Sequence, residues 1–423
     1  MRWPIVKVGK VCTPISQMDP SRNNGGLFRY VDIAGIDRES KVISRVETIP
    51  CSEAPSRARK MLQAGDVIVS TVRPNLNAIA QVPKDLDGEI ASTGFAVLRA
   101  NPNLVDSRYL YYRTQHREFV DFLVSNATGA SYPAVSDEIV RNASIPLPPL
   151  SEQRRIVEIL DEADRIRRLR KEANQKAERI LPALFLKMFG DPATNPKGWD
   201  VEKLGAVCDV VSGATPRTDN PNYFGDDIFW ATPKDLSSLN DYVLQYTERK
   251  LSENGFDNCS TRLLPKGTVL LSSRAPIGLV AIADMPVCTN QGFKNLIPGS
   301  RLSSWYVFAW AVLRKDFIKS QGRGATFKEI SKEITLGFPI AVPPKSFQNK
   351  FSSMMEKFRS ERLNLQKSES HIDELCHLLT QQAFEGQLTA KWRKAHMKEL
   401  LAEMEAQARL LNIPKSKLEK IFQ

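Results

Sequence analysis

The order of apolar and polar positions along the chain predicts two similar globular parts, each followed by a long helix. Short apolar runs between turn residues predict strands, most clearly at 66–71 and 268–273. Apolar residues at helical spacing follow at about 107–124 and 303–319. A proline-rich turn then precedes a long, mostly polar helical stretch in each half. The pattern therefore predicts a mixed α/β protein.

An internal repeat relates the two halves. Residues 3–12 and 199–208 share five of ten residues at an offset of 196 without a gap. Further similar pairs follow in the same order, at offsets between 195 and 202: 65–70 with 267–272, 93–95 with 291–293, 107–109 with 304–306, 129–132 with 324–327 and 148–153 with 343–348. A repeat of this length indicates two homologous modules with one fold and small loop insertions.

Both long helices carry apolar residues at nearly heptad spacing. These are Ile156, Ile159, Ala163, Ile166, Leu169, Ala173, Ala177, Ile180 and Leu184 in the first helix, and Phe351, Met354, Phe358, Leu365, Ile372, Leu375 and Leu379 in the second. Because the two stripes share one register, we expect the helices to pack on each other as an antiparallel coiled coil with pseudo-twofold symmetry. The alternative is that each stripe docks on its own module. Ser151 and Ser346 are expected to be N-caps, and Pro182 is expected to kink or end the first helix.

Length and composition narrow the class of protein. At 423 residues and 47.5 kDa, the chain is too long for a single ordinary domain. Its 42% of hydrophobic residues, 25% of charged residues and mean hydropathy of -0.30 are typical of a soluble folded protein. No apolar run of about 20 residues and no signal peptide is present, so a cytoplasmic protein is expected. The six cysteines form no C-x-x-C pair and the four histidines are scattered, so we expect reduced cysteines, no disulfides and no metal site.

The net charge suggests a polyanionic partner. Fifty-nine basic and 48 acidic residues leave 59 - 48 = +11. The excess is spread as +3, +3, +2 and +3 over residues 1–149, 150–190, 191–345 and 346–423. An even spread argues against a basic tail and favours folded surfaces that each contact phosphate.

Motifs for catalysis are missing from the sequence. There is no phosphate-binding G-x-x-x-x-G-K-[ST] loop. Residues 220–223 (Asn-Pro-Asn-Tyr) resemble the tetrad with which adenine methyltransferases hold a flipped base, but the third residue differs and no glycine-rich cofactor turn accompanies it. We therefore interpret the chain as a binding protein without a cofactor. A self-sufficient DNA-modifying enzyme with an unrecognised active site is the alternative.

Several motifs together resemble one family. They are Phe-Gly-Asp-Pro-Ala-Thr-Asn-Pro-Lys-Gly-Trp at 189–199, Ser-Gly-x-Thr-Pro at 212–216, Ile-Pro-Leu-Pro-Pro-Leu-Ser-Glu-Gln at 145–153 and Ala-Phe-Glu-Gly-Gln-Leu at 383–388. The set resembles the specificity subunit of type I restriction-modification enzymes over residues 1 to about 393. The resemblance implies two target-recognition domains that each read half of a split, asymmetric sequence in double-stranded DNA. It also implies that the chain scaffolds methyltransferase subunits, expected to be two, and restriction subunits, which would use S-adenosylmethionine, ATP and Mg²⁺.

The resemblance and the repeat together predict five segments. These are recognition domains at 1–149 and 191–345, helical spacers at 150–190 and 346–390, and a C-terminal helical extension at 391–423. In the extension, Trp392, His396, Leu400, Met404 and Leu411 lie at helical spacing, and Pro414 is expected to open a second short helix. A helix that caps the chain's own bundle is favoured over one that binds a partner.

Candidate DNA-binding residues are polar, basic or aromatic and lie on turns of both modules, because bases and phosphates are contacted by donors and acceptors on rigid loops. In the first module they are Thr71, Arg73, Asn75, Thr93, Gly129, Ser131 and Tyr132. In the second they are Thr215, Arg217, Tyr223, Lys234, Ser273, Arg274, Asn290, Gln291, Arg323 and Thr326. Each alone is also consistent with a solvated loop residue. Their recurrence at matching places in the two modules favours a binding role.

Overall fold

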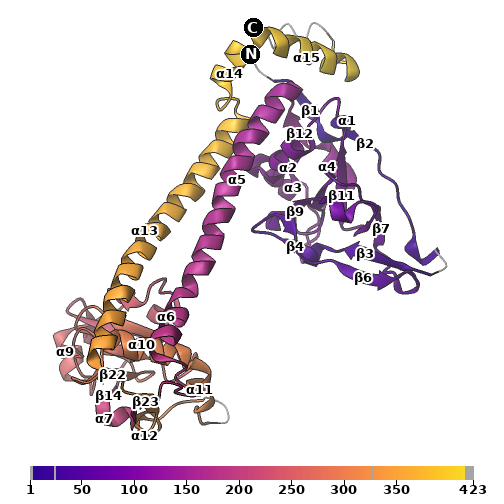
Figure 1. The fold of residues 1–423 in the computed structure, drawn as a ribbon. Helices are drawn as coiled ribbons and strands as arrows, with labels where there is room; N and C mark the ends of the chain where they lie inside the picture. Colours follow the sequence, from indigo (N-terminus) through magenta and orange to yellow (C-terminus); the bar gives the residue numbers. More distant parts are fainter. Residues whose placement is uncertain (1–2, 23–24, 325–327, 415–423) are drawn as a thin grey trace. The chain divides into compact units, whose positions relative to one another are not determined.

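The computed structural model describes residues 3–22, 25–324 and 328–414, which form two compact units (Figure 1). Unit 1 contains residues 1–168 and 371–423, and unit 2 contains residues 169–370. The division falls within both long helices, α5 (Leu150–Glu178) and α13 (Lys345–Phe384). The units are therefore grouped differently from the five predicted segments, whose boundaries remain a prediction.

The module of unit 1 contains two four-stranded sheets. One has the order β6 (Glu47–Pro50), β3 (Leu27–Val31), β10 (Ile90–Ser92), β7 (Ala58–Met61), and the other has the order β2 (Cys12–Thr13), β11 (Phe95–Ala100), β8 (Val67–Ser70), β9 (Ile79–Gln81). Two small pairs are β1 (Ile5–Lys7) with β12 (Ser144–Pro146) and β4 (Ile36–Asp37) with β5 (Val42–Ile43). The helices are α1 (Val8–Val11), α2 (Ser107–Gln115), α3 (Arg117–Ser125) and α4 (Asp137–Asn142). Short 3-10 turns lie at Pro20–Arg22, Ile33–Gly35, Cys51–Glu53, Pro74–Leu76 and Lys84–Leu86.

The module of unit 2 has a similar plan, with one more strand in one of its two larger sheets and one small strand pair in place of two among the described residues. A five-stranded sheet has the order β14 (Cys208–Ser212), β22 (Lys294–Pro298), β19 (Val269–Leu271), β20 (Val280–Ala283), β17 (Val243–Leu244). A four-stranded sheet has the order β15 (Phe224–Gly225), β18 (Lys250–Leu251), β16 (Ile228–Ala231), β21 (Cys288–Thr289), and β13 (Val201–Lys203) pairs with β23 (Pro339–Ala341). The helices are α7 (Leu204–Val207), α8 (Pro233–Ser237), α9 (Glu253–Asp257), α10 (Ser304–Leu313), α11 (Lys315–Ser320) and α12 (Lys332–Leu336), with a 3-10 turn at Pro221–Tyr223.

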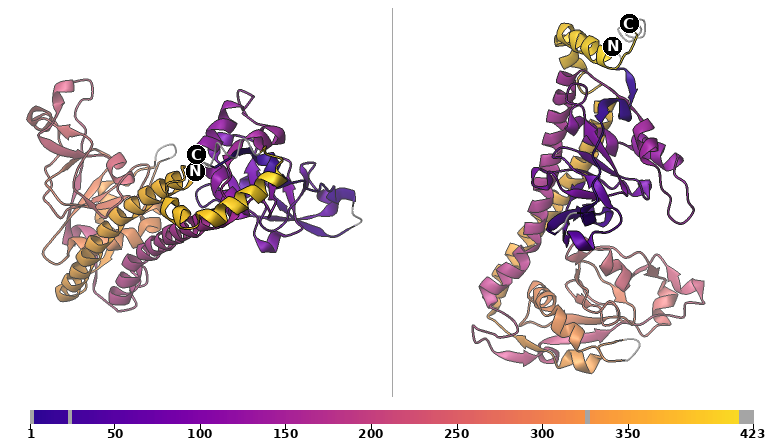
Figure 2. Two further views of the ribbon diagram at one scale, coloured as in Figure 1. Left: turned by 90° about the horizontal axis from the view of Figure 1, so that it is seen from above. Right: turned by 90° about the vertical axis from the view of Figure 1, so that its right-hand side faces the viewer.

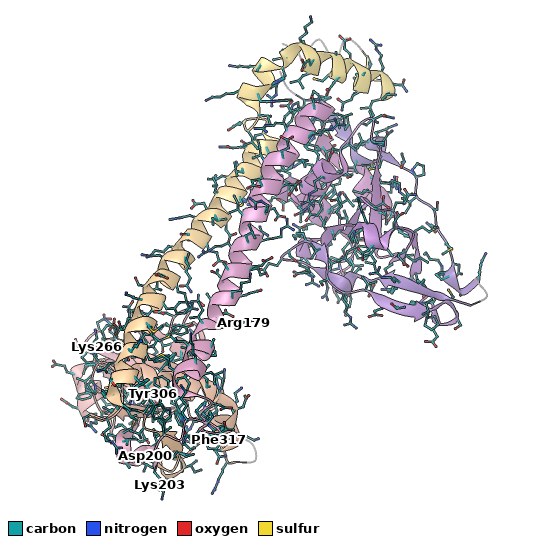
Figure 3. All side chains as sticks on the ribbon, viewed as in Figure 1. Arg179, Asp200, Lys203, Lys266, Tyr306 and Phe317 are labelled. Atoms are coloured by element: carbon teal, nitrogen blue, oxygen red, sulfur yellow. The ribbon has the colours of Figure 1, made fainter. Side chains whose placement is uncertain are left out.

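The predicted repeat is confirmed in the hydrogen bonds of the two modules. The hydroxyl of Tyr109 donates to the carbonyl of Pro146 at 2.9 Å, and that of Tyr306 donates to Ala341 at 2.9 Å. Tyr306 lies inside unit 2 (Figure 3), where it is 1% exposed. Each bond joins a helix of the module, α2 or α10, to the strand that precedes the following long helix, β12 or β23. The two halves therefore share internal contacts as well as sequence.

The two strands that the apolar runs predict are buried on both faces. Val67 and Val69 of β8 belong to the core beneath α2, whereas Ile68 belongs to a second core on the opposite face. In β19, Val269 and Leu271 lie in one core and Leu270 in another. Successive side chains of a strand point to opposite faces, so a continuous apolar run is needed where both faces are covered.

The long helices run side by side in opposite directions within each unit (Figures 1 and 2). In unit 1 the start of α5 packs with the end of α13, where Ile156 and Leu160 share a core with Phe384. In unit 2, Phe351 of α13 packs with Phe185 of α6 (Ile180–Phe189). The same residues also belong to the module cores, so both predicted packing arrangements occur together.

The predicted seam is wrong at several positions. Exposed fractions of 39% or more are found for Ile166, Leu169, Ile180, Met354, Leu365 and Leu375. The middle of the helix pair in unit 2 instead includes a polar contact, from Asn174 Nδ2 to Glu369 Oε2 at 2.5 Å. A strict heptad repeat fails here because the module faces, and not only the partner helix, select which positions are buried.

Breaks and starts of the long helices are explained by backbone chemistry. Helix α5 ends at Glu178 and α6 begins at Ile180, which confirms the break expected near Pro182. Proline has no N–H to donate to the carbonyl four residues earlier, which is that of Glu178. The predicted N-caps are wrong, because α5 begins at Leu150 and α13 at Lys345, so that Ser151 and Ser346 lie inside the first turn.

The C-terminal extension forms α14 (Ala390–Ala395) and α15 (Met397–Leu410), which pack on unit 1 (Figure 1). Leu400 and Met404 are buried, as their helical spacing predicted. The expected second short helix falls on residues 415–423, outside the described residues. In the part of the chain that the structure describes, no helix is long and apolar enough to span a membrane.

Candidate nucleic-acid interface

In the first module, three turns that carry candidate DNA-binding residues meet at the end of β8. The backbone N–H and the hydroxyl of Thr71 both donate to the carbonyl of Gly94 at 2.9 Å. The N–H of Val135 donates to the carbonyl of Thr71 at 2.9 Å, and Thr128 pairs with Ala134 across the base of the glycine loop. Because β8 pairs with β11, the 92–94 turn necessarily lies beside Thr71. We call this arrangement loop cluster 1.

Arg73 and Tyr132 form the most prominent side-chain pair of loop cluster 1. The N–H of Arg73 donates to Pro133 at 2.7 Å, and its guanidinium lies 4.6 Å from the centre of the Tyr132 ring. Tyr132 is 69% exposed. Arg73 has a φ of 49°, in the left-handed region that residues with a side chain seldom adopt. The buried Pro74 follows it, so the backbone fixes an exposed cation against an exposed ring.

The second module rebuilds the same framework, which we call loop cluster 2. The N–H of Ser273 donates to Gly292 at 2.7 Å, and the N–H of Ile330 donates to Ser273 at 3.0 Å. Arg323 and Glu329 form the bridge that closes the neighbouring loop. These backbone hydrogen bonds correspond to the backbone hydrogen bonds of Thr71 and Thr128 in the first module. The repeat therefore places equivalent turns together in both modules.

Arg274 has a different partner from Arg73, although both follow the same strand of the repeat. Its guanidinium lies 2.9 Å from the Glu329 carboxylate, and Lys294 Nζ lies 3.4 Å from the same carboxylate. Burial favours the neutral form of Glu329, but the hydrogen bond from Arg274 and the charge of Lys294 outweigh it, so the pKa of Glu329 is lowered. Loop cluster 2 thus holds its arginine in an ion pair.

The Ser-Gly-x-Thr-Pro turn joins loop cluster 2 through close backbone packing. A Cβ atom on Gly213 would lie 2.0 Å from the carbonyl oxygen of Asn290, so only glycine fits there. The side chain of Asn290 accepts a hydrogen bond from the N–H of Gly292 at 2.9 Å. The side chains of Thr215 and Gln291 are in contact. The turn and the 290–292 loop therefore form one surface.

Two candidate cations on the neighbouring surface are already paired with carboxylates. Arg217 lies 3.0 Å from Asp219, and Lys234 lies 2.7 Å from Glu248. The hydrogen bond that Lys234 donates to the Glu248 carboxylate raises the pKa of Lys234. Tyr223 is half-buried and lies in the 3-10 turn at Pro221–Tyr223. Each of these cations can pair with a phosphate only if it gives up its carboxylate partner.

The seventeen candidate DNA-binding residues differ in their exposure to solvent. Thr71 is 7% exposed and Ser273 is fully buried, so both position the loops rather than present free groups. Exposed members are Arg73, Asn75, Thr93, Gly129, Ser131, Tyr132, Arg217, Lys234, Arg274, Gln291 and Arg323, and partly exposed members are Thr215, Tyr223 and Asn290. Thr326 lies outside the described residues.

The sequence analysis missed a basic, aromatic surface on the four-stranded sheet of unit 2. The guanidinium of Arg249 lies 4.0 Å from the centre of the Phe224 ring and 5.3 Å from that of Trp230. Lys250 Nζ lies 5.0 Å from the centre of the Phe229 ring. These residues lie outside the motif pairs that defined the repeat, so those pairs gave no indication of them. The aromatic residues at 224, 229 and 230 were the available signal.

Three buried or partly buried cysteines do not have the properties of nucleophiles. Burial raises the pKa of the Cys12 and Cys208 thiols to about 12 and that of Cys288 to about 11. Such thiols stay protonated near neutral pH. In the same part of the chain, no group of three or more His, Cys, Asp or Glu residues is placed to hold a metal ion.

Comparison with known proteins identifies relatives that match between 43% and 92% of the chain. The MjaIX specificity subunit of a type I restriction enzyme from Methanocaldococcus jannaschii is 37% identical over 184 residues, which are 43% of this chain and 42% of that protein. The HindI specificity subunit from Haemophilus influenzae is 21% identical over 417 residues and covers 79% of this chain and 89% of its own length. A solved chain, from a structure that concerns complex assembly and conformational transition of the type I R-M system, is 31% identical with a TM-score of 0.64. It covers 92% of this chain and 98% of its own length.

The family described as type I restriction modification DNA specificity domain matches residues 22–179 and 196–372. The two matched regions contain loop clusters 1 and 2, one in each. The chain therefore belongs to the family of type I restriction modification DNA specificity proteins.

Proposed function

We propose that the chain reads DNA for a type I restriction-modification complex and that each module binds one half of a bipartite, asymmetric site. The observation that carries this proposal is the pairing of a shared framework with different exposed side chains. Loop clusters 1 and 2 have the same backbone hydrogen bonds at Thr71 and Ser273. Their arginines differ, since Arg73 stacks on Tyr132 and Arg274 pairs with Glu329. One framework with two sets of side chains is suited to reading two different half-sites.

The net charge of +11 supports DNA as the partner. In the proposed complex, the helical spacers set the distance between half-sites, and the chain binds two methyltransferase subunits together with restriction subunits. Those subunits would use S-adenosylmethionine, ATP and Mg²⁺, while the chain itself needs no cofactor. We place this complex in the cytoplasm.

Exchange of one module tests the proposal. Residues 191–345 are replaced by the corresponding module of a relative, and the methylated sequence is mapped in cells that carry the partner subunits. We expect one half of the recognised sequence to change and the other half to remain. A change in both halves would show that the site is read jointly, contrary to the proposal.

The alternative of a self-sufficient enzyme has a separate test. The purified chain is incubated with S-adenosylmethionine and DNA of mixed sequence. We expect no methyl transfer by the chain alone, and activity only after a methyltransferase subunit is added.

A further inference from the structure

In unit 1, helix α15 covers the surface where α5 begins (Figure 1). Its buried face consists of Leu400, Met404, Gln407 and Ala408, which are 4% exposed or less. On the covered surface, Pro148 and Pro149 are buried. The C-terminal extension is thus an amphipathic helix seated on the proline-rich turn of the first module.

Two polar side chains one turn apart anchor α15. Glu403 Oε2 accepts hydrogen bonds from the N–H of Ser151 at 2.9 Å and from its hydroxyl at 3.0 Å. Gln407 Nε2 donates to the carbonyls of Leu104 and Pro148 at 2.9 and 3.3 Å. Glu403 therefore serves the first turn of α5, where backbone N–H groups lack a partner within the helix.

A buried ionic network holds the segment that precedes α15. Glu152 is fully buried and accepts hydrogen bonds from Trp3 Nε1 at 2.9 Å, Thr389 Oγ1 at 2.6 Å and Arg393 Nε at 2.7 Å. The network joins the N-terminal residues, α5 and the extension. A buried carboxylate of this kind requires such partners.

Unit 2 rebuilds the surface that α15 covers. Gln348 Nε2 donates to the carbonyls of Arg301 and Pro343 at 2.9 and 2.7 Å, as Gln153 does to Leu104 and Pro148 in unit 1. Ser346 occupies the place of Ser151 in the first turn of its helix. The acceptors for a glutamine and the donors for a glutamate are therefore both present in unit 2.

The surface of unit 2 is open where that of unit 1 is covered. Phe347 is 46% exposed, whereas Glu152 at the same place in the repeat is fully buried. Pro344 is exposed, whereas the matching Pro149 is buried. A pocket of about 390 Å³ lies here, lined by Gly198, Trp199, Asp200, Arg301, Val342, Pro343, Pro344 and Lys345. Figure 3 labels Asp200, one of these lining residues.

The hydrogen-bonding groups around this surface specify the character of its occupant. The charges that line the pocket have no single sign, because Lys345 and Asp200 are both exposed and Arg301 is paired with Glu202. Ser346 offers the donors that bind Glu403 in unit 1, and the carbonyls of Arg301 and Pro343 match those that bind Gln407. An amphipathic helix with a glutamate and a glutamine one turn apart therefore complements the open surface in both apolar area and hydrogen-bonding groups.

We propose that the surface of unit 2 formed by Trp199, Pro344 and Phe347 docks an amphipathic helix of a partner protein that carries a glutamate and a glutamine one turn apart, as α15 covers unit 1. The occupant is a partner helix rather than α15 of a second copy, because the buried Glu152 that binds Arg393 is replaced here by Phe347. The proposal rests on the proposed function only in that this chain assembles with other proteins.

A peptide of residues 396–412 is the probe, because it contains Glu403 and Gln407 but omits Arg393. Fluorescence anisotropy measures binding of the labelled peptide to the unaltered full chain and to its Phe347→Asp variant. Aspartate is favourable in the first turn of a helix, so this variant is expected to fold. Leu263→Asp is the matched control, because Leu263 is 44% exposed in the same unit.

We expect saturable binding to the unaltered chain and to Leu263→Asp, and at least tenfold weaker binding to Phe347→Asp. Absence of binding, or equal binding to the Phe347→Asp variant, would overturn the proposal. DNA affinity of the chain alone should be the same for all three proteins. If the unaltered chain did not bind DNA, that result would instead count against the proposed function.

A photo-crosslinking residue in place of Phe347 tests the assembled complex with its methyltransferase and restriction subunits. A crosslink to an amphipathic helix of another subunit that carries a glutamate and a glutamine one turn apart supports the proposal. A crosslink to residues 390–414 of a second copy, or none in a complex that assembles, contradicts it.

Discussion

At the scale of single residues, the two modules use one backbone framework to hold different side chains. Arg73 and Arg274 follow matching strands, yet Arg73 stacks on Tyr132 while Arg274 is paired with Glu329. An arginine held against a ring keeps its hydrogen-bond donors available for a base or a phosphate. An arginine in an ion pair must first exchange its carboxylate. We therefore expect the two residues to contribute unequally to DNA binding.

Arg73→Ala is expected to weaken DNA binding more than Arg274→Ala does. If Arg73 reads a guanine, about 1–3 kcal/mol of discrimination is lost at one position. If it contacts phosphate, all sequences weaken together and the salt dependence becomes less steep by about one ion. Titration of specific and scrambled duplexes at several salt concentrations distinguishes the two outcomes. Arg117→Ala, at an exposed residue of α3, is the control, and an Arg73→Ala variant with unchanged affinity and salt dependence would refute the assignment.

The Glu329 ion pair predicts a pH dependence for the stability of unit 2. The folded-state pKa of Glu329 lies below 4.5, so its contribution is complete above that pH and is lost as the pH falls through the lowered value. Glu329→Gln removes this contribution. We expect the thermal unfolding midpoint of the unaltered chain to fall more steeply than that of the variant between about pH 5 and pH 3. Parallel curves would show that the pair does not stabilise the folded state.

At the scale of elements, the start of each long helix is fixed to its module by a buried glutamine. Gln153 and Gln348 are both fully buried and each makes the same three hydrogen bonds, one of them from the N–H of Asp106 or Ser303. In unit 1, Gln407 also donates to the carbonyls that Gln153 contacts. The modules are therefore braced in the same way, and among the residues that the structure describes a second donor is found in unit 1.

Gln348→Leu is expected to destabilise the protein more than Gln153→Leu. Leucine leaves buried carbonyls without a donor, at a cost of about 1–3 kcal/mol. In the Gln153→Leu variant, Gln407 still donates to Leu104 and Pro148, so part of that cost is avoided. Urea unfolding of both variants measures the difference. Equal losses would mean that Gln407 does not substitute for Gln153.

At the scale of the whole molecule, the proposed function requires two readers joined by helices of fixed length. Each long helix contributes to both compact units, since its two ends belong to different ones. Polar and exposed positions occupy the middle of both helices, including Leu169 at 50% and Leu365 at 39% exposure. A segment whose side chains serve neither module core is the part that can change length without disturbing a fold.

Insertion of one heptad into the middle of both α5 and α13 is expected to lengthen the unread gap between half-sites. Seven helical residues add roughly 10 Å, which corresponds to about three base-pair steps of duplex. The half-site sequences should stay the same. Selection from a DNA library with variable gaps gives the preferred spacing. A folded protein whose preferred gap does not move would show that other contacts fix the distance.

The sequence alone predicted the framework of the candidate site better than its chemistry. Matching motifs in the two halves selected the turns at Thr71 and Ser273 and also the glycine-containing loops, which the structure places beside them. The motifs could not show that both residues are buried, or that Glu329 neutralises Arg274. They also missed Arg249, whose aromatic partners come from separate strands. Contacts between residues distant in sequence depend on strand pairing, which a local pattern does not specify.

By itself, the sequence determined the repeat, the buried strands, the long helices and the break before Pro182, because each depends on local spacing or backbone chemistry. Only the tertiary structure decided which stripe positions are buried, since Ile166 and Met354 face solvent once the modules cover other parts of their helices. It also decided the asymmetry between the modules. The extension covers the proline-rich turn of one unit, and the equivalent turn of the other stays open at Phe347, because only Glu152 provides a buried charge to hold Arg393.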